Sequence, residues 1–357
     1  MNQTSVQYTT SASQASPITI KTLDSTAIDR WDSYVQTAAE ATFFHKAGWA
    51  TVLSQGLGHR TYYLYAEQDG RIRGVLPLGH IESLLFGNSL ISTPFCVYGG
   101  AVADTAKIRT TLEDKAAALA SELAVDYLEL RNRTYAREDW PTKDLYVTFR
   151  KSIAADPEVN MKAIPRKQRA VVRKGLQAGF AAELDNEIDR FFFAYSTSVR
   201  NLGTPVFPRR FFVLLKRIFA DDCEIMTVLK DGRIVSSVMS FYFRNEVLPY
   251  YGGGTDEARV LKANDFMYWE LMRRAGERGI EVFDYGRSKR GTGAYDFKRN
   301  WGFEPEPLAY QYHLVNSTSV PDINPLNPKY RLFINVWKHL PLPLANSLGP
   351  LISRNLG

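Results

Sequence analysis

The chain has 357 residues, of which 45% are hydrophobic, and it carries a formal net charge of +6. This size and apolar share predict two globular domains and exclude a fibrous or fully disordered chain. The sequence has no apolar run long enough to cross a membrane, no histidine spacing typical of metal ligands, and only two isolated cysteines. We therefore expect a cytoplasmic protein without a metal or a disulfide framework, and its positive charge favours anionic partners.

The N-terminal stretch, residues 1–17, is polar, uncharged and rich in Ser, Thr and Gln. It lacks the basic start and the apolar core of a secretion signal. A segment of this composition cannot bury apolar surface, so we expect a disordered tail.

The sequence Asp-Gly-Arg-Ile occurs twice, at Asp69–Ile72 and at Asp231–Ile234. Each copy lies between two runs rich in β-branched and aromatic residues. Because Asp-Gly accepts the positive φ angles of tight turns, both copies predict a β-hairpin.

Further features recur after each hairpin, at offsets that resemble the 162 residues between the two turns. A Tyr-Gly-Gly sequence, a helical segment and a strand-like run follow in the same order, at residues 98–100, 106–124 and 125–131 and again at 251–253, 263–279 and 280–286. Shared order and spacing indicate a duplication. Each half then has an α/β (α+β) fold, with a mixed, mostly antiparallel sheet flanked by helices.

The seam between the halves falls near Asp156-Pro157, before a basic helix that starts near Pro165. We place the first domain at residues 18–155, the second at 156–318, and a Pro-rich tail at 319–357. The tail contains a helix candidate, Tyr330–Leu340, with one apolar stripe. This helix either packs on the domains or lies on a membrane surface with its basic neighbours toward anionic headgroups, namely Lys329, Arg331, Lys338 and Arg354.

Two basic clusters are candidate anion sites. In the first cluster six cations occur within 13 residues with no acid between them, and helical spacing places Arg166, Arg169 and Arg173 on one face. Such a face either binds the phosphates of RNA, a nucleotide-linked sugar or a lipid, or is simply solvated. In the second cluster Arg209 and Arg210 follow Pro208 at a helix start, where the helix dipole also favours anions.

The second half resembles the FemAB-type transferases, which consist of tandem GNAT-like (acyl-CoA N-acyltransferase-like) domains. The resemblance rests on the basic helix PRKQRAVVRKGLQAGF, the Tyr-Tyr-Gly-Gly-Gly segment at 250–254, and the closing stretch FDYGRSKRGTGAYDFKRNWGF at 283–303. It covers about residues 18 to 315. Among these transferases the chain looks most like the FemAB-like proteins that accompany exosortase (PEP-CTERM) and exopolysaccharide loci.

The resemblance implies a site in the second half. It assigns donor binding and oxyanion stabilisation to Lys298. Tyr251 would bind a sugar or phosphate beside the glycine turn that follows it. Asp284, at the end of a predicted strand, either acts as a general base or pairs with Arg287 or Lys289. The remaining expected substrate-binding residues of the site are Tyr250, Gly252, Gly253, Arg287 and Tyr295.

The donor is an acyl-CoA or an aminoacyl-tRNA, and no tightly bound cofactor is expected. Residues 254–264 lack the glycine-rich pyrophosphate loop of acetyl-CoA-dependent GNAT enzymes, which favours the tRNA. The first half has no counterpart of Lys298, so we expect it to be structural or to bind the acceptor.

The expected function is transfer of an aminoacyl or acyl group to a nucleotide- or lipid-linked glycan precursor of the cell envelope, with tRNA and the inner membrane surface as further partners. One alternative is a CoA-dependent N- or O-acetyltransferase acting on an exopolysaccharide sugar. The other is a non-catalytic scaffold of a polysaccharide-assembly complex.

Overall fold

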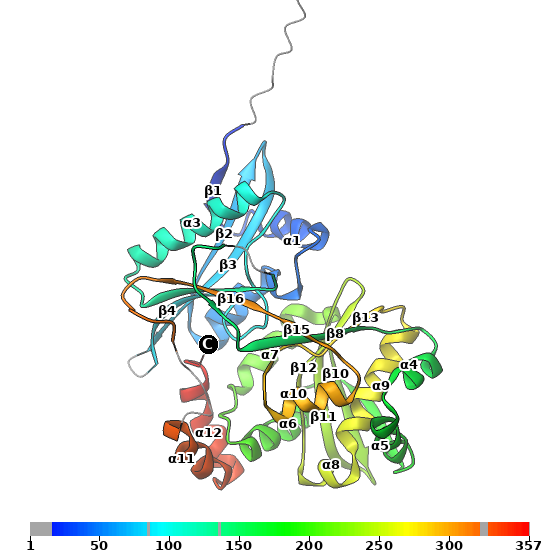
Figure 1. Cartoon of the computed structure of the whole chain (residues 1–357). Coiled ribbons are helices and arrows are strands. Elements are labelled where there is room, and N and C mark those ends of the chain that lie inside the picture. Colours follow the sequence, from blue (N-terminus) through cyan, green and yellow to red (C-terminus); the bar gives the residue numbers. More distant parts are fainter. Residues whose placement is uncertain (1–15, 84–85, 135–136, 322–327, 357) are drawn as a thin grey trace, which may run out of the picture.

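The computed structural model describes residues 16–83, 86–134, 137–321 and 328–356, so the predicted tail at 1–17 lies almost wholly outside the described residues. Two eight-stranded sheets stand one above the other (Figure 1). The first has the order β1-β2-β3-β4-β6-β16-β7, with β5 beside β3. Its strands are β1 (Thr19–Thr22), β2 (Arg60–Gln68), β3 (Arg71–Ser83), β4 (Gly87–Ser92), β5 (Val102–Ala103), β6 (Tyr127–Asn132), β7 (Thr142–Lys143) and β16 (Ala309–Leu314).

The second sheet has the order β14-β8-β13-β12-β11-β10-β9, with β15 beside β8. Its strands are β8 (Tyr146–Ser152), β9 (Phe180–Asp185), β10 (Cys223–Lys230), β11 (Arg233–Phe243), β12 (Glu246–Gly254), β13 (Val282–Asp284), β14 (Ser288–Lys289) and β15 (Pro305–Pro307). In each sheet one parallel pair, β4 with β6 and β12 with β13, interrupts the antiparallel order. The predicted α/β class with mixed, mostly antiparallel sheets is confirmed.

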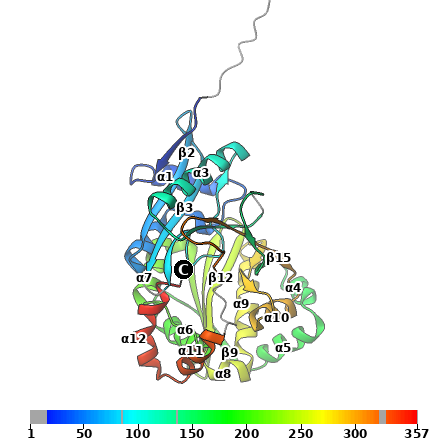
Figure 2. The same ribbon diagram turned by 60° about the vertical axis from the view of Figure 1, so that its left-hand side comes forward.

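Helices flank both sheets. Those of the first half are α1 (Ile28–Thr37), η1 (Phe43–His45), α2 (Gly48–Thr51), η2 (Val52–Leu57) and α3 (Ala106–Glu122). Those of the second half are α4 (Pro157–Ala163), α5 (Arg166–Leu176), α6 (Asp189–Leu202), α7 (Arg209–Phe219), η3 (Ala220–Asp222), α8 (Asp256–Leu261), α9 (Ala263–Glu277) and α10 (Gly293–Asn300). Two C-terminal helices, α11 (Pro328–Lys338) and α12 (Leu342–Ser353), lie beside α6 (Figure 2).

Both predicted hairpins are present, as β2–β3 and β10–β11. Their Asp-Gly turns adopt the left-handed backbone conformation, with φ of 51° and 70° at Asp69 and Gly70 and 50° and 75° at Asp231 and Gly232. Asn, Asp and Gly tolerate this region, which matches the right-handed twist of the flanking strands. The local turn chemistry therefore fixes the same hairpin in both halves.

The two sheets exchange strands. β8 precedes the expected boundary at 155/156 but pairs with β13 in the second sheet, while β16 returns from the second half to pair with β6 in the first. In each sheet the exchanged strand pairs with one member of the parallel pair. β16 pairs with β6 in the first sheet, and β8 pairs with β13 in the second. The two sheets are thus joined by a pair of crossing strands, β8 and β16.

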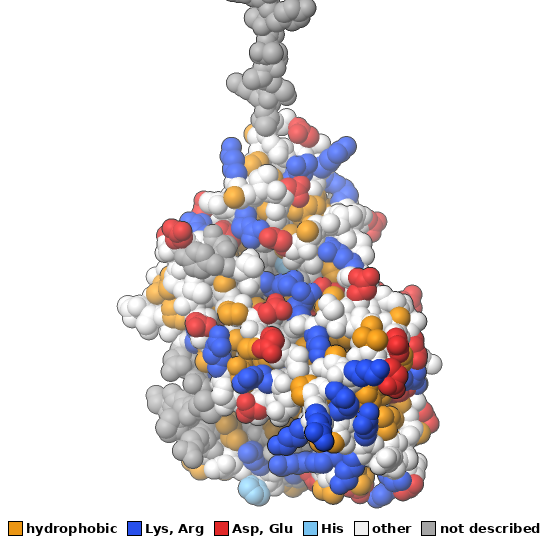
Figure 3. Space-filling model, turned by 45° about the vertical axis from the view of Figure 1, so that its right-hand side comes forward, with side chains coloured by type: hydrophobic (Ala, Val, Ile, Leu, Met, Phe, Trp, Pro, Cys, Tyr) orange, Lys and Arg blue, Asp and Glu red, His pale blue; other side chains and the backbone are white. Residues whose placement is uncertain are grey.

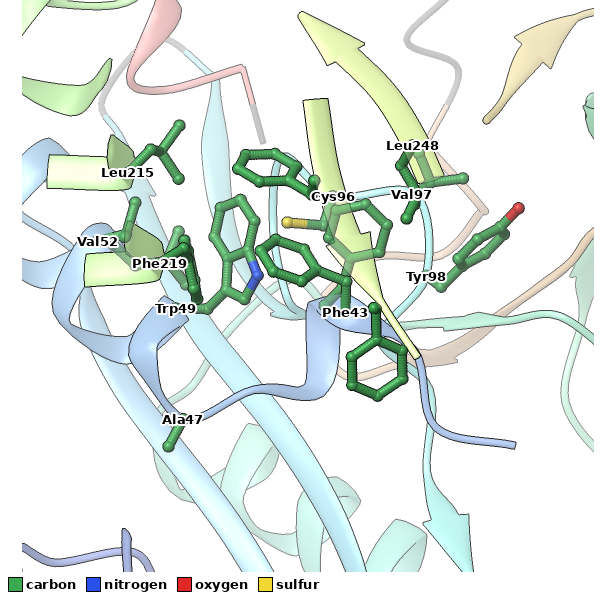
Figure 4. Packing of buried hydrophobic residues seen from close by; sticks show 14 of the residues in the cluster. Phe43, Ala47, Trp49, Val52, Cys96, Val97, Tyr98, Leu215, Phe219 and Leu248 are labelled. Atoms are coloured by element: carbon green, nitrogen blue, oxygen red, sulfur yellow. The ribbon is translucent and has the colours of Figure 1, made fainter. Parts of the chain in front are cut away.

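A shared hydrophobic core joins the halves (Figure 4). Phe43 of the first half stacks on Phe241 of β11 with ring centroids 4.4 Å apart, and Trp49 contacts Phe219 of α7 at 5.3 Å. Phe43, Trp49 and Phe241 are fully buried. Aromatic burial on this scale holds the two halves in a fixed relation.

Candidate functional site

Lys298 lies inside the protein, with 9% of the residue exposed. Its helix, α10, is capped by Thr292, whose hydroxyl accepts a hydrogen bond from the amide of Tyr295. The Nζ atom donates to the carbonyl oxygens of Gly286 (2.9 Å) and Arg287 (3.0 Å), and it lies 5.5 Å from the centre of the Phe149 ring. Lys298 is therefore not a solvent-exposed surface residue.

Burial lowers the pKa of Lys298 to about 7, because the charged form loses its water. The carboxylate of Asp284 opposes this shift, whereas the guanidinium of Arg287 adds to it. An ammonium group has three N–H donors and the two carbonyls accept two of them, so neither carbonyl uses the third.

Asp284 ends β13 and is 1% exposed. Its carboxylate accepts hydrogen bonds from the Gly286 amide (2.7 Å) and the Tyr98 hydroxyl (3.1 Å), and it lies 3.3 Å from the Nε atom of Arg150. Burial raises the pKa of Asp284, and the Arg150 charge opposes the rise. The carboxylate thus pairs with Arg150 of the exchanged strand β8, rather than with the predicted partners Arg287 or Lys289.

Tyr251 does not join these residues in the structure. The glycine run was expected to be a turn, but Gly252–Gly254 continue β12, paired with β11. Tyr251 points toward α6 and α7, with its ring packed against Tyr195 and Phe212 at 5.7 and 5.3 Å. This is an aromatic core position, and the Tyr251 hydroxyl has no hydrogen-bond partner there.

The glycines are required by helix packing. A Cβ atom at Gly252 would lie 2.8 Å from the Tyr268 hydroxyl of α9, and one at Gly253 would lie 2.6 Å from the Cβ of Ser198 of α6. The glycines thus let helices approach both faces of β12, which explains them without a ligand. The neighbouring Tyr250 donates a hydrogen bond to the carbonyl of Phe95 and so ties β12 to the first half.

Arg287 and Phe149 contact Lys298, and Tyr295 contacts Phe149. The half-buried Arg287 guanidinium lies over the ring of Tyr146 (4.4 Å) and donates to the Tyr310 hydroxyl (3.2 Å). Tyr295 packs edge-on against Phe149, with ring centroids 5.4 Å apart. Together they form the wall of the lysine site.

Both arginines of the expected anion site, Arg209 and Arg210, have partners within the protein. Arg209 forms an ion pair with Asp189 at 2.5 Å, and Arg210 donates to the carbonyl of Gly56 in the first half at 2.9 Å. Arg210 therefore joins the halves through its Nε atom, and Arg209 is paired with a carboxylate.

The basic helix α5 carries an exposed cationic surface. Arg169 donates to the carbonyls of Lys162 and Ile164 and so caps α4, whereas Arg166 and Arg173 remain exposed. With Lys174 these two arginines line a shallow groove, which we call the α5 basic patch. Figure 3 shows a dense group of basic side chains low on this face of the molecule.

A pocket of about 340 Å³ lies where the halves meet. We call it the junction pocket. Most of its lining comes from the first half, including His45, Tyr98, Gly99, Gly100, Arg109, Arg131 and Arg133, while Thr148 and residues 306–308 close the other side. The expected cleft was confined to the second half. The sequence signal that marks this pocket is the first Tyr-Gly-Gly copy together with the Arg-Asn-Arg that ends β6.

The three arginines of the junction pocket differ in their partners. Arg131 is buried, pairs with Glu129 at 2.7 Å and donates to the Cys96 carbonyl, while Arg109 pairs with Glu40. Arg133 lies over the Tyr98 ring at 5.4 Å, and within the described chain no carboxylate lies at ion-pair distance from it. Arg133 is therefore the cation of this pocket that remains to meet a ligand.

The pocket is connected to the buried lysine. The Tyr98 hydroxyl contacts Thr148 on the pocket wall and also donates to Asp284. Asp284 in turn stabilises the charge on Lys298. Tyr98 and Asp284 thus lie between the junction pocket and Lys298.

Gly100 allows the pocket loop to approach β6. A Cβ atom there would lie 1.8 Å from Oδ1 of Asn132, whose amide donates to Gln311 of β16 at 3.0 Å. We expect Gly100→Ala to lower the free energy of unfolding by about 1–3 kcal/mol, as in other overpacked sites. Urea denaturation measures this, with Gly293→Ala as a control because no atom lies within 4 Å of its added methyl group. Equal stabilities of the Gly100→Ala variant and the wild type would contradict this packing.

The sequence of the second half resembles a known domain family. Residues 160–299 match the acetyltransferase (GNAT) domain family. The matched segment lies in the second half of the chain and contains Lys298. No curated protein matches the sequence.

Three solved structures share the two-domain fold. The crystal structure of FemX has a TM-score of 0.66 at 14% identity, covering 84% of this chain and 98% of that one. A tandem GNAT protein from the clavulanic acid biosynthesis pathway has a TM-score of 0.55 at 12% identity, covering 85% and 100%. The C-terminal domain of a putative lysylphosphatidylglycerol synthetase from Agrobacterium fabrum has a TM-score of 0.55 at 13% identity, covering 80% and 91%. The predicted tandem GNAT-like architecture is confirmed.

Proposed function

We propose that this protein is a FemAB-like acyltransferase that moves an aminoacyl or acyl group onto a nucleotide- or lipid-linked precursor of the cell envelope. The observation that carries the proposal is the buried Lys298, which keeps one N–H donor free beside Asp284 and is linked through Tyr98 to a cationic pocket. The fold shared with FemX supports the same reaction class. The association with exosortase and exopolysaccharide loci is a finer part of the same proposal.

In the proposed reaction the amine or hydroxyl of the acceptor attacks the acyl carbonyl carbon. A new N–C or O–C bond forms, the bond from the acyl carbon to the donor oxygen or sulfur breaks, and the proton of the acceptor passes to the leaving group. Negative charge develops on the carbonyl oxygen, where the free N–H of the Lys298 ammonium donates. Asp284 stabilises that ammonium and orients Tyr98 toward the pocket.

The junction pocket is the proposed acceptor site. Its unpaired Arg133 suits a phosphate or pyrophosphate group, since a guanidinium donates two parallel hydrogen bonds to such an anion. A nucleotide- or lipid-linked sugar carries that group next to the sugar. The pocket then holds the acceptor on the first-half side of Tyr98, with the acyl donor on the Lys298 side.

The donor in this proposal is an aminoacyl-tRNA. The segment after β12 begins α8 with Asp256 and Glu257 in its first turn, and carboxylates at this helix start repel the pyrophosphate of CoA. The α5 basic patch instead offers cations close to α10, because Pro165 before α5 meets Gly302 after α10. RNA lying on α5 would bring its acyl end toward Lys298.

The donor assignment is tested with the triple variant Arg166→Gln, Arg173→Gln and Lys174→Gln. We expect weaker tRNA binding in fluorescence anisotropy and a salt slope that is smaller by about 2–3, since each of the three lost phosphate contacts removes about 0.7–0.9. The control triple Arg71→Gln, Lys115→Gln and Arg217→Gln removes the same charge elsewhere. Equal losses of tRNA affinity in both triple variants would show that binding depends on net charge and not on the α5 basic patch.

One observation favours a second candidate function. The matched domain family is that of acetyltransferases, so a CoA-dependent N- or O-acetyltransferase acting on an exopolysaccharide sugar is the alternative. Thermal stabilisation by CoA but not by charged tRNA would select it. A non-catalytic scaffold would bind neither.

The transfer itself is tested by mass spectrometry of envelope precursors from cells with and without the protein. We expect a mass increment equal to one aminoacyl residue. An acetyl increment selects the alternative, and identical precursors would remove the enzymatic proposal.

A further inference from the structure

The two C-terminal helices expose an unusual amount of apolar surface. Of the fifteen large apolar side chains that the described residues expose, seven belong to the stretch 332–356, namely Leu332, Phe333, Val336, Leu344, Leu348, Leu351 and Leu356. Leu332 and Leu351 are 74% and 62% exposed. A cluster of this kind at one end of a molecule marks an interaction surface.

α12 is oriented against the usual rule for a helix on a globular protein. Its buried face consists of small residues, Ala345, Gly349 and Ser353, spaced four residues apart. Gly349 allows close contact with Val206, since a Cβ there would lie 2.9 Å from the Val206 amide, and Ser353 donates to the Val206 carbonyl. The leucines at 344, 348 and 351 point outward instead.

This orientation has an energetic consequence. Large apolar side chains normally face the core, because each one stabilises the fold by leaving water. Here the helix is held by its small face and by hydrogen bonds, such as that between Asn346 and Ser196. The outward leucines leave between 39% and 62% of their surface in water, and this surface is available for an apolar environment outside the fold.

α11 continues the same surface. Its Trp337 is buried and stacks on Phe333 with ring centroids 5.2 Å apart, while Leu332 and Val336 face solvent. The predicted apolar stripe of this helix is therefore divided between the protein and the outside. The side chains of Lys329 and Arg331 lie outside the described residues, whereas Lys338 is exposed. Figure 2 shows α11 and α12 together at one end of the molecule.

The charge of this region indicates its partner. The sequence from 324 to 357 contains four Lys or Arg residues and no Asp or Glu. Among the described residues no helix is long and apolar enough to cross a membrane. Exposed leucines combined with unopposed cations are the composition of helices that lie in the plane of an anionic bilayer surface.

We propose that α11 and α12 dock this protein on the surface of an anionic lipid bilayer, with the leucines of α12 and the outer face of α11 inserted among the acyl chains. Lys338 and Arg354 then reach the headgroups. A second copy of this chain would bring the same cations together without acids to pair them, so the charge favours lipid over self-association. This surface is independent of the proposed transfer reaction.

The test is co-sedimentation of the full chain with phosphatidylcholine vesicles that contain either no phosphatidylglycerol or about one such lipid in three. We expect binding to the anionic vesicles, and a loss of at least about tenfold in partitioning for Leu344→Gln, Leu348→Gln and Leu351→Gln combined. The control triple Ile28→Gln, Leu184→Gln and Val260→Gln replaces equally exposed side chains elsewhere and should bind like the wild type.

Three results would overturn the proposal. One is wild-type protein that stays in the supernatant with anionic vesicles. Another is binding that survives the α12 triple but is lost with the α5 basic patch triple, which would place the contact on α5. The third is a dimer in light scattering that the α12 triple dissociates, which would identify a second copy as the occupant. Unchanged thermal unfolding of the α12 triple, measured alongside, separates lost docking from lost fold.

Discussion

Replacement of Lys298 by Met is expected to reduce acyl transfer by about 10²–10³-fold, the usual cost of removing one donor to a developing oxyanion. Met fills the space of the buried aliphatic stem but has no N–H to offer. The measurement is the precursor mass increment in cells that express the variant. Lys115→Met, which changes a half-exposed lysine of α3, is the matched control and should transfer normally. Normal transfer by Lys298→Met would remove this residue from the mechanism.

The pH dependence of transfer separates two roles for Lys298. Its pKa is about 7, so the ammonium with its third N–H dominates below this pH and the neutral amine above it. If the ammonium stabilises the oxyanion, the rate falls as pH rises through about 7. A rate that instead rises through the same range would make the neutral amine a general base. Asp284→Asn should shift the midpoint to lower pH, since the carboxylate favours the charged lysine.

The same pKa has a consequence for stability. Between pH 7 and the ordinary lysine value of 10.5, the unfolded chain holds a proton at residue 298 that the folded chain has lost. The free energy of unfolding therefore rises with pH across this window. Lys298→Met lacks the titration, so its stability relative to the wild type should decline from pH 7 to 10. Denaturation at several pH values measures this, and parallel curves would contradict the burial of the charged group.

The features that sequence predicts well are local in origin. The Asp-Gly turns, the helices after them and the short strand that ends at Asp284 depend on neighbouring residues, and each lies where its pattern places it. Order and spacing of these features were enough to recognise the duplicated fold. The burial of Lys298 is different in kind, because it depends on α10 lying against the loop at 286–287.

The features that sequence misses depend on contacts between the halves. Arg150 reaches Asp284 only because β8 crosses into the second sheet, and the hydrophobic pattern of a strand does not say which sheet it joins. The junction pocket likewise needs Tyr98 and Thr148 from segments on different sheets. Tyr251 was wrongly predicted to lie in the site. A glycine run that lets helices pack closely against a strand has the same sequence as a glycine loop that binds a ligand.

Removal of the free cation in the junction pocket should have the second largest effect. We expect Arg133→Ala to weaken binding of an anionic acceptor about 10- to 100-fold, the range for hydrogen bonds to a charged group. A nucleotide diphosphate sugar such as UDP-N-acetylglucosamine is a suitable probe, with binding measured by calorimetry. The stability of the fold should change little, because within the described chain the side chain forms no ion pair and lies over the Tyr98 ring at 5.4 Å.

Two companion variants make the Arg133 result specific. Arg133→Lys keeps the charge but loses the planar fork of donors, so it should restore part of the affinity if a phosphate is bound. Arg60→Ala removes an exposed arginine at the start of β2 that pairs with Glu82 of β3, and it should leave binding unchanged. Affinity that is equal in Arg133→Ala and in the wild type would move the acceptor out of this pocket. The proposed role of Lys298 in oxyanion stabilisation would then stand, but Tyr98 would not connect it to a bound acceptor.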